Sequence, residues 1–209
     1  MATQLTRRRR RVKHQWSSTE ETRRSILDAA RSVFGRYGFA DANVAEIVEM
    51  AGSSVGSLYH HFGGKSELFV ALWEQHRDAQ QQQAADAVAA AAEAGETDPW
   101  ELFLVSTRSF LDFSWEHRDL VRLFFDGDTP TGFGKELSDW RRATISSALK
   151  PFKTDDDAID RVMVLTFTSV LGEAGREIAR SRITADATAL ADNVMRVLTP
   201  LRDSLTAAV

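Results

Sequence analysis

The chain has 209 residues, of which 43% are hydrophobic and 27% are charged, and it contains no cysteine. This composition is typical of a soluble globular protein, and the lack of cysteine excludes disulfide frameworks, thiol catalysis and cysteine-ligated zinc sites. The longest uncharged apolar run, "VMVLTFTSVLG" at residues 162–172, is too short to cross a membrane, so we expect no transmembrane segment.

Charge is distributed unevenly along the chain. The first 40 residues contain ten Lys and Arg against three Asp and Glu, whereas the whole chain carries a net charge of −4. A basic terminus favours binding to a polyanion, although arginine-rich tails are often only solvated. The block from Arg7 to Lys13 lacks the apolar segment that an export signal requires, so we expect a cytoplasmic protein. Residues 1–18 are predicted to form a disordered basic arm.

Three helices are predicted in the domain that follows, residues 19–64. Apolar residues recur at the i, i+3, i+4 and i+7 positions of amphipathic helices over residues 19–37, 44–51 and 55–62. A glycine follows each helix, as is common at helix C-termini. The side chains suited to cap the two short helices are Asp41 or Asn43, and Ser53 or Ser54.

The remainder, residues 65–209, is predicted to be a second helical domain. A long connecting helix covers residues 65–95, and its distal part is a low-complexity segment rich in Ala and Gln, which favour helix. No alternation typical of a β-strand is present. The fold class is therefore all-α, with about nine helices in all. The further helices expected after the connecting helix cover residues 99–115, 119–125, 135–149, 156–182 and 185–205.

The two short helices, "NVAEIVEMAGSSVGSLYHHF" at residues 43–62, have the proportions of a helix-turn-helix unit, whose second helix enters the major groove of DNA. If Val55, Leu58 and Phe62 face the core, small polar residues lie on the open side of this helix. Short side chains allow the backbone to approach DNA closely, and hydroxyls can reach base edges or phosphates. The pattern predicts a DNA-binding domain, and a packed helical hairpin without DNA affinity is the alternative.

These residues carry a family resemblance. "VAEIVEMAGSSVGSLYHHFGGKSELF" resembles the DNA-binding motif of the TetR family of transcriptional regulators, and "TRRSILDAARSVFGRYGF" is similar to the first helix of that family. The resemblance covers about residues 19–73. It implies a three-helix DNA-binding domain followed by a helical ligand-binding and dimerisation domain. The residues that it implies to face DNA are Ser53, Ser54, Val55, Ser57, Tyr59 and His60, with Asn43 and Lys65 on phosphates.

The sequence departs from the family pattern at three places. Ala42 and Asn43 stand where two threonines are frequent, Val55 where lysine is frequent, and Gly64 where a serine or asparagine cap is usual. These changes leave few strong base-reading side chains, and the operator sequence is not predicted. We hypothesise that the arm from Arg7 to Lys13 compensates by reaching a minor groove or the DNA backbone.

Aromatic residues are concentrated in the second domain, where eleven of the seventeen Phe and Trp residues follow residue 98. Such residues at helical spacing ordinarily form plain core, but the resemblance implies a small-molecule cavity among residues 98–182. An aromatic lining would suit a bulky apolar or aromatic effector oriented by a few polar groups. The expected lining residues are Phe103, Phe110, Trp115, Phe124, Trp140 and Phe167, with Thr107, Arg108 and Thr166 as polar orienters.

The last two predicted helices, residues 156–182 and 185–205, carry broad apolar faces. The resemblance implies that they form a four-helix interface in a homodimer, and the alternative is an intramolecular bundle. A dimer would place two recognition helices about one turn of DNA apart, roughly 34 to 36 Å, and so match a palindromic operator. The predicted function is a ligand-responsive transcriptional regulator. Its simplest form is a repressor that binds a double-stranded DNA operator and is released from it by an effector.

An all-α enzyme is the main alternative from another class. His60 and His61 are adjacent, so they point in different directions on a helix and do not form a paired site. Asp126 and Asp128 lie in a predicted turn, where Asp is a common residue. We therefore expect no enzymatic activity, no metal and no cofactor. A helical ligand-binding or scaffolding protein without DNA affinity is a second alternative.

Deletion of residues 1–14 should weaken operator binding and reduce its dependence on salt, because fewer counterions would be released from the DNA. Fluorescence anisotropy of a labelled operator at two salt concentrations measures both quantities. Unchanged affinity with an unchanged salt slope would show that the arm does not contact DNA.

Overall fold

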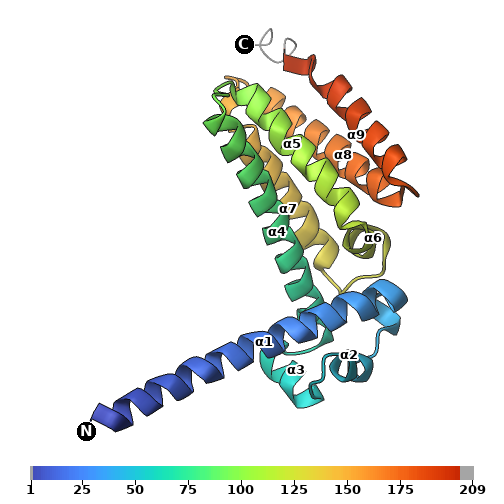
Figure 1. Ribbon diagram of the computed structural model, residues 1–209. Coiled ribbons are helices and arrows are strands. Elements are labelled where there is room, and N and C mark those ends of the chain that lie inside the picture. Colours follow the sequence, from blue (N-terminus) through green and yellow to red (C-terminus); the bar gives the residue numbers. More distant parts are fainter. Residues whose placement is uncertain (1, 203–209) are drawn as a thin grey trace. The chain divides into compact units, whose positions relative to one another are not determined.

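The computed structural model describes the backbone of residues 2–202 and the side chains of residues 19–202. In this part of the chain the structure is entirely helical, which confirms the all-α prediction (Figure 1). No described helix is long and apolar enough to span a membrane. The α-helices are α1 (Ala2–Asp41), α2 (Val44–Met50), α3 (Val55–Phe62), α4 (Lys65–Glu93), α5 (Pro99–Glu116), α6 (Arg118–Asp126), α7 (Phe133–Ala148), α8 (Asp157–Arg180) and α9 (Thr184–Leu198), and a 3-10 helix, η1, covers Lys150–Phe152.

The chain divides into two compact units, an N-terminal unit of Met1–Gln75 and a C-terminal unit of His76–Val209. The boundary falls inside α4, whereas the sequence predicted a boundary at residues 64 and 65. The difference arises because the first turns of α4 bury Leu68, Phe69 and Leu72. Apolar side chains at this spacing form one face of a helix, and that face completes the core of the N-terminal unit.

The core of the N-terminal unit is built from the buried faces of α1, α2, α3 and the start of α4. The ring of Phe69 meets Phe34 at 5.5 Å and Phe39 at 5.3 Å between centroids, both edge to face. Edge-to-face contact is a favoured geometry for aromatic pairs. The other large side chains that are fully buried here are Ile26, Leu27, Ile47, Leu58, Leu68 and Trp73.

Helix α1 is interrupted near its end by Gly38, which has φ 77° and ψ −178°. This conformation is nearly restricted to glycine, and it turns the chain so that Phe39 reaches the ring of Phe34 at 6.1 Å. At its other end the backbone of α1 begins at Ala2, where the sequence predicted a disordered arm. Arginine is a good helix former, which accounts for the helical backbone. The side chains of residues 1–18 lie outside the described residues.

The C-terminal unit is organised around α8, which contacts α5, α6, α7 and α9. Figure 1 shows α5 and α9 running alongside α8. Trp100 and Phe103 of α5 stack at 5.3 Å and meet Phe167 of α8, and Leu111 with Ile178 forms a second buried cluster further along the same pair of helices. These two clusters hold α5 and α8 along most of their length.

The two glycines of α1, Gly35 and Gly38, allow a matched test of the non-helical conformation at Gly38. Gly38→Ala should lower the free energy of unfolding by about 1–3 kcal/mol, because alanine is strained at this φ and ψ. Gly35→Ala, on an exposed position with no atom within 4 Å of the new Cβ, should raise it by about 0.5–1 kcal/mol. Chemical denaturation measures both. A Gly38→Ala protein as stable as Gly35→Ala would contradict the described conformation.

Candidate nucleic-acid interface and cavity

The turn between α2 and α3 is held by a complete set of backbone hydrogen bonds. The amide of Gly52, which has φ 60°, donates to the carbonyl of Glu49, and the amide of Ser53 donates to that of Val48 at 2.8 Å. This pair of bonds is the Schellman arrangement that ends a helix. One residue later, the hydroxyl of Ser54 accepts from the amide of Ser57 at 3.1 Å and so caps α3. The geometry of the two helices is therefore set by local hydrogen bonds.

Helix α3 is anchored by Leu58, which is 0% exposed, and presents its opposite side to solvent. Tyr59 is 54% exposed and Val55 is 46% exposed. The expectation from spacing that Val55 faces the core is wrong, because Val55 is the first residue of α3 and lies beyond the part of the helix that packs. Its exposure agrees with the DNA-facing position that the resemblance implies. His60 is also exposed, whereas Ser53 and Ser57 are half-buried.

Asn43 and Ser54 both have structural roles in this unit. The Oδ1 atom of Asn43 accepts from the amide of Ala45 at 2.8 Å and caps α2. Each cap satisfies an amide that a helix N-terminus would otherwise leave without a partner. Asn43 is exposed, and its predicted phosphate contact remains a prediction.

Lys65 forms contacts that the sequence did not predict. Its Nζ atom donates to the carbonyls of Ala40 and Ala42, both at 2.8 Å, and lies 4.9 Å from the centre of the Phe39 ring. The ammonium thereby ties the start of α4 to the last turn of α1 and to the residue that follows this helix. The predicted phosphate contact of Lys65 remains a prediction, and at most part of the donor capacity of the ammonium is available for it.

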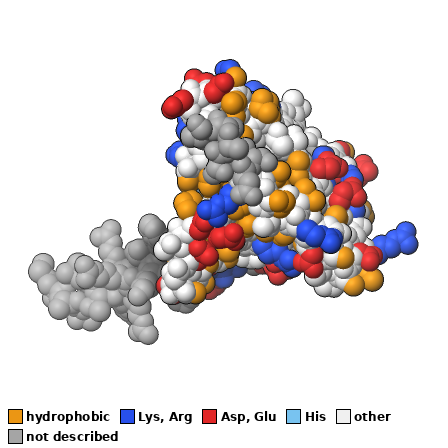
Figure 2. Space-filling model, turned by 90° about the horizontal axis from the view of Figure 1, so that it is seen from above, with side chains coloured by type: hydrophobic (Ala, Val, Ile, Leu, Met, Phe, Trp, Pro, Cys, Tyr) orange, Lys and Arg blue, Asp and Glu red, His pale blue; other side chains and the backbone are white. Residues whose placement is uncertain are grey.

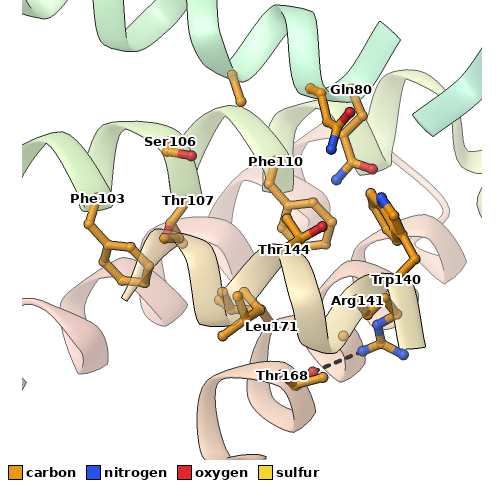
Figure 3. Close-up of a pocket in the computed structure, with 15 residues that line it drawn as sticks. Gln80, Phe103, Ser106, Thr107, Phe110, Trp140, Arg141, Thr144, Thr168 and Leu171 are labelled. Atoms are coloured by element: carbon orange, nitrogen blue, oxygen red, sulfur yellow. Dashed lines mark hydrogen bonds between the residues drawn. The ribbon is translucent and has the colours of Figure 1, made fainter. Parts of the chain in front are cut away.

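A cavity of about 120 Å³ lies in the C-terminal unit (Figure 3). Side chains from α4, α5, α7 and α8 line it, and its wall is mostly apolar. Four of the nine residues predicted to line a ligand site are in this wall, namely Phe103, Thr107, Phe110 and Trp140. The cavity wall thus includes two of the predicted aromatic residues of α5 and the one tryptophan of α7, and their contact with a ligand stays a prediction.

The other five predicted residues lie outside this cavity. Phe124 and Phe167 are buried in core clusters, and Trp115 lies under the guanidinium of Arg118 at 4.3 Å. Arg108 is ion-paired with Asp112 and Asp192, and Thr166 is exposed. For Arg108 and Phe167 the reason is the rotation of the helix, because each directly precedes or follows a lining residue and so points about 100° away from it.

Several lining residues were missed, and most of them are polar. Figure 3 shows Gln80 of α4, Thr144 and Arg141 of α7, and Thr168 of α8 around the cavity. Trp140 and Thr144 are four residues apart on one face of α7, so a polar side chain on the apolar face of that helix was the available signal. The contribution of α4 was hidden by the low-complexity sequence of its distal part.

Arg141 is the only charged residue in the wall of the cavity as described. Its Nη2 atom donates to the carbonyl of Thr168 at 2.9 Å, and its guanidinium lies 5.4 Å from the centre of the Phe125 ring. Burial lowers the pKa of Arg141 below its ordinary value, and the positive charge of Arg176 nearby lowers it further, with Glu173 acting in the opposite direction. The direction shows that the folded chain disfavours this charge.

The two units together define a class of protein, a helix-turn-helix protein with a separate helical unit that encloses a small-molecule-sized cavity. Residues 26–72 match the family model described as bacterial regulatory proteins, tetR family. The N-terminal unit thus carries the DNA-binding region of the TetR family of transcriptional regulators, as the resemblance implied.

Curated relatives match the N-terminal part of the chain. The transcriptional regulator AcrR of Shigella flexneri is 42% identical over 55 residues, which are 26% of each chain. The transcriptional repressor AcnR of Corynebacterium efficiens is 43% identical over 51 residues, which are 24% of this chain and 27% of the relative. The matches thus span about a quarter of the length of these relatives, whose names describe regulators and not enzymes.

The whole fold is similar to solved structures. A TetR-like transcriptional regulator from Rhodococcus sp. RHA1 superposes with a TM-score of 0.63, covering 85% of this chain and 93% of the other at 22% identity. At this identity the likeness concerns the fold alone. It extends the agreement from the N-terminal unit, where the sequence relatives match, to the C-terminal unit, where they do not.

Substitution of Lys65 separates its structural role from a role in phosphate binding. Lys65→Met should lower the free energy of unfolding by about 1–2 kcal/mol, because charge-assisted hydrogen bonds to the Ala40 and Ala42 carbonyls are lost. The matched control is Lys135→Met, whose ammonium contacts only exposed Asp139, and it should change stability by no more than about 0.5 kcal/mol. Equal stability of both variants in thermal denaturation would show that the hydrogen bonds from Lys65 to Ala40 and Ala42 do not stabilise the fold.

Proposed function

We propose that this protein is a ligand-responsive transcriptional regulator that binds a palindromic DNA operator as a homodimer. The observation that carries the proposal is the exposed side of α3, where Val55, Tyr59 and His60 are free of core packing and lie in the segment that matches the family model. A recognition helix needs this combination of a buried anchor and an open face to enter a major groove.

The proposed DNA contacts divide into two kinds. Tyr59 and His60 are suited to phosphates or base edges, and Ser53 and Ser57 bring hydroxyls close to the same side. Asn43 and Lys65 would contact phosphates with the donors that their structural hydrogen bonds leave over. Val55 offers only apolar contact, such as with a thymine methyl group.

Homodimerisation is supported by apolar side chains that α8 and α9 leave exposed. Val162, Leu165 and Val170 of α8 and Val197 of α9 are exposed in the single chain. Figure 2 shows hydrophobic side chains on the surface of the molecule. Burial of such side chains stabilises protein interfaces, and two-fold symmetry would match the symmetry of a palindrome. Sedimentation of the full chain at micromolar concentration tests the dimer directly.

Release by an effector would operate through α4. This helix begins in the N-terminal unit at Lys65 and supplies Gln80, Gln81 and Ala84 to the wall of the cavity. A ligand that prefers one position of α4 would change the separation of the two DNA-binding units in a dimer, with a coupling of about 1 to 3 kcal/mol. Repression by steric block requires no further contacts and is the proposed mode of action, which would take place on DNA in the cytoplasm.

Operator binding is tested with fluorescence anisotropy, using DNA from around the protein's own gene and random DNA as competitor at two salt concentrations. Tight binding of one fragment, well above binding to random DNA, is expected. Equal weak binding to both that vanishes at high salt would leave only non-specific attraction and would contradict the proposal.

The two tyrosines of the chain provide a matched pair of variants for the same assay. Tyr59→Phe should weaken operator binding about tenfold, because a hydrogen bond to a charged phosphate is lost. Tyr37→Phe, on an exposed position of α1 beside Arg36, should leave operator affinity unchanged. Equal affinity of both variants would exclude Tyr59 from the interface.

A further inference from the structure

Arg141 places a positive charge at the wall of the cavity without a negative charge to balance it. Its one hydrogen bond within the described residues is donated to the backbone carbonyl of Thr168, and no carboxylate of these residues lies within ion-pair distance. Burying a charge without a counter-charge is costly, so a side chain of this kind calls for an explanation other than stability.

Other arginines of the C-terminal unit are paired differently. Arg108 binds the carboxylates of Asp112 and Asp192, and Arg176 binds that of Glu173. Arg180 pairs with Asp126 and Glu177. Glu173, the carboxylate that acts on the charge of Arg141, is thus already paired with Arg176.

The position of Arg141 is fixed by the helix opposite. A Cβ atom on Gly172 of α8 would lie 1.2 Å from Nη2 of Arg141, so the guanidinium occupies the space that a side chain at residue 172 would fill. The ring of Phe125 holds it from another side. A long basic side chain usually extends its charge into water, whereas this one is held at the wall of the cavity.

The hydroxyl of Thr168 is a second unsatisfied group at the same place. Its Oγ1 atom is shielded from solvent and has no hydrogen-bond partner among the described residues. A threonine inside a helix commonly donates to the carbonyl four residues earlier, and this one does not. Figure 3 shows Thr168 next to Arg141, with Phe110, Trp140 and Leu171 around the same cavity.

We propose that Arg141 and Thr168 form an anion subsite and that the effector is a hydrophobic carboxylate about the size of one aromatic ring. The carboxylate accepts from the guanidinium and, after a rotation of the Thr168 side chain, from its hydroxyl. The ring lies against Phe110, Trp140 and Leu171. A planar carboxylate matches the fork of one guanidinium, and a cavity of roughly 150 Å³ holds one benzene ring, close to the volume found here.

This inference rests on the proposed function and specifies its effector. The test uses the full-length protein with benzoate, phenylacetate and 3-phenylpropionate as probes, each paired with its uncharged amide. Ligand-observed NMR titration gives the affinities. We expect at least one carboxylate to bind ten or more times as tightly as its amide. Arg141→Gln should remove this difference by weakening the carboxylate about tenfold or more while leaving the amide unchanged.

The matched control is Arg142→Gln, which removes the same charge from the next residue, an exposed one that does not line this cavity. It should bind the carboxylate as the unaltered protein does. Arg141→Lys should retain part of the preference, and a circular dichroism melt verifies that each variant is folded. If the Arg141→Gln protein is misfolded, the Arg141→Lys variant and the comparison of carboxylate with amide decide whether the anion subsite exists.

Three results would overturn the inference. They are the absence of binding by every carboxylate at millimolar concentration, equal binding of carboxylate and amide by the unaltered protein, and an equal loss of affinity in the Arg141→Gln and Arg142→Gln proteins. Operator binding without ligand is measured separately. If it fails while the carboxylate preference holds, the proposed function is wrong and the anion subsite stands.

Discussion

Helix α4 is the constraint on which the rest of the structure depends. Its first turns bury Leu68, Phe69 and Leu72 in the core of the N-terminal unit, and its later turns contribute to the wall of the cavity in the other unit. A continuous helix resists bending because each backbone hydrogen bond ties a residue to one a turn away. Both units therefore contain part of the same helix.

The N-terminal unit is a case in which local rules are sufficient. Asn43 caps α2 and Ser54 caps α3, and each was one of two candidates that the sequence offered. Gly52 ends α2. Each of these features needs only neighbouring residues, and this is why the three helices were predictable. The tie from Lys65 to Ala40 and Ala42 was not, since it joins residues more than twenty positions apart.

The C-terminal unit was predictable as a set of helices but less so as a site. Phe103, Phe110 and Trp140 were identified from composition and resemblance, yet Phe124 and Phe167 have the same chemical character and lie in the core instead. The rotation of each helix about its own axis decides between these outcomes, and it depends on packing against partners far away in the sequence. Arg141 and Thr168 were missed for the same reason, since polar residues on a helix are ordinarily assigned to solvent.

Gly172 illustrates how a residue without a side chain can determine whether a cavity wall carries a charge. It lines the cavity itself, and the space beside it is what admits the Arg141 guanidinium to the cavity wall. A methyl group there would drive the charge elsewhere and leave a neutral pocket with its aromatic surface intact. The preference of such a pocket for acids or for neutral compounds can thus change through a single substitution at a residue that offers no polar group of its own to a ligand.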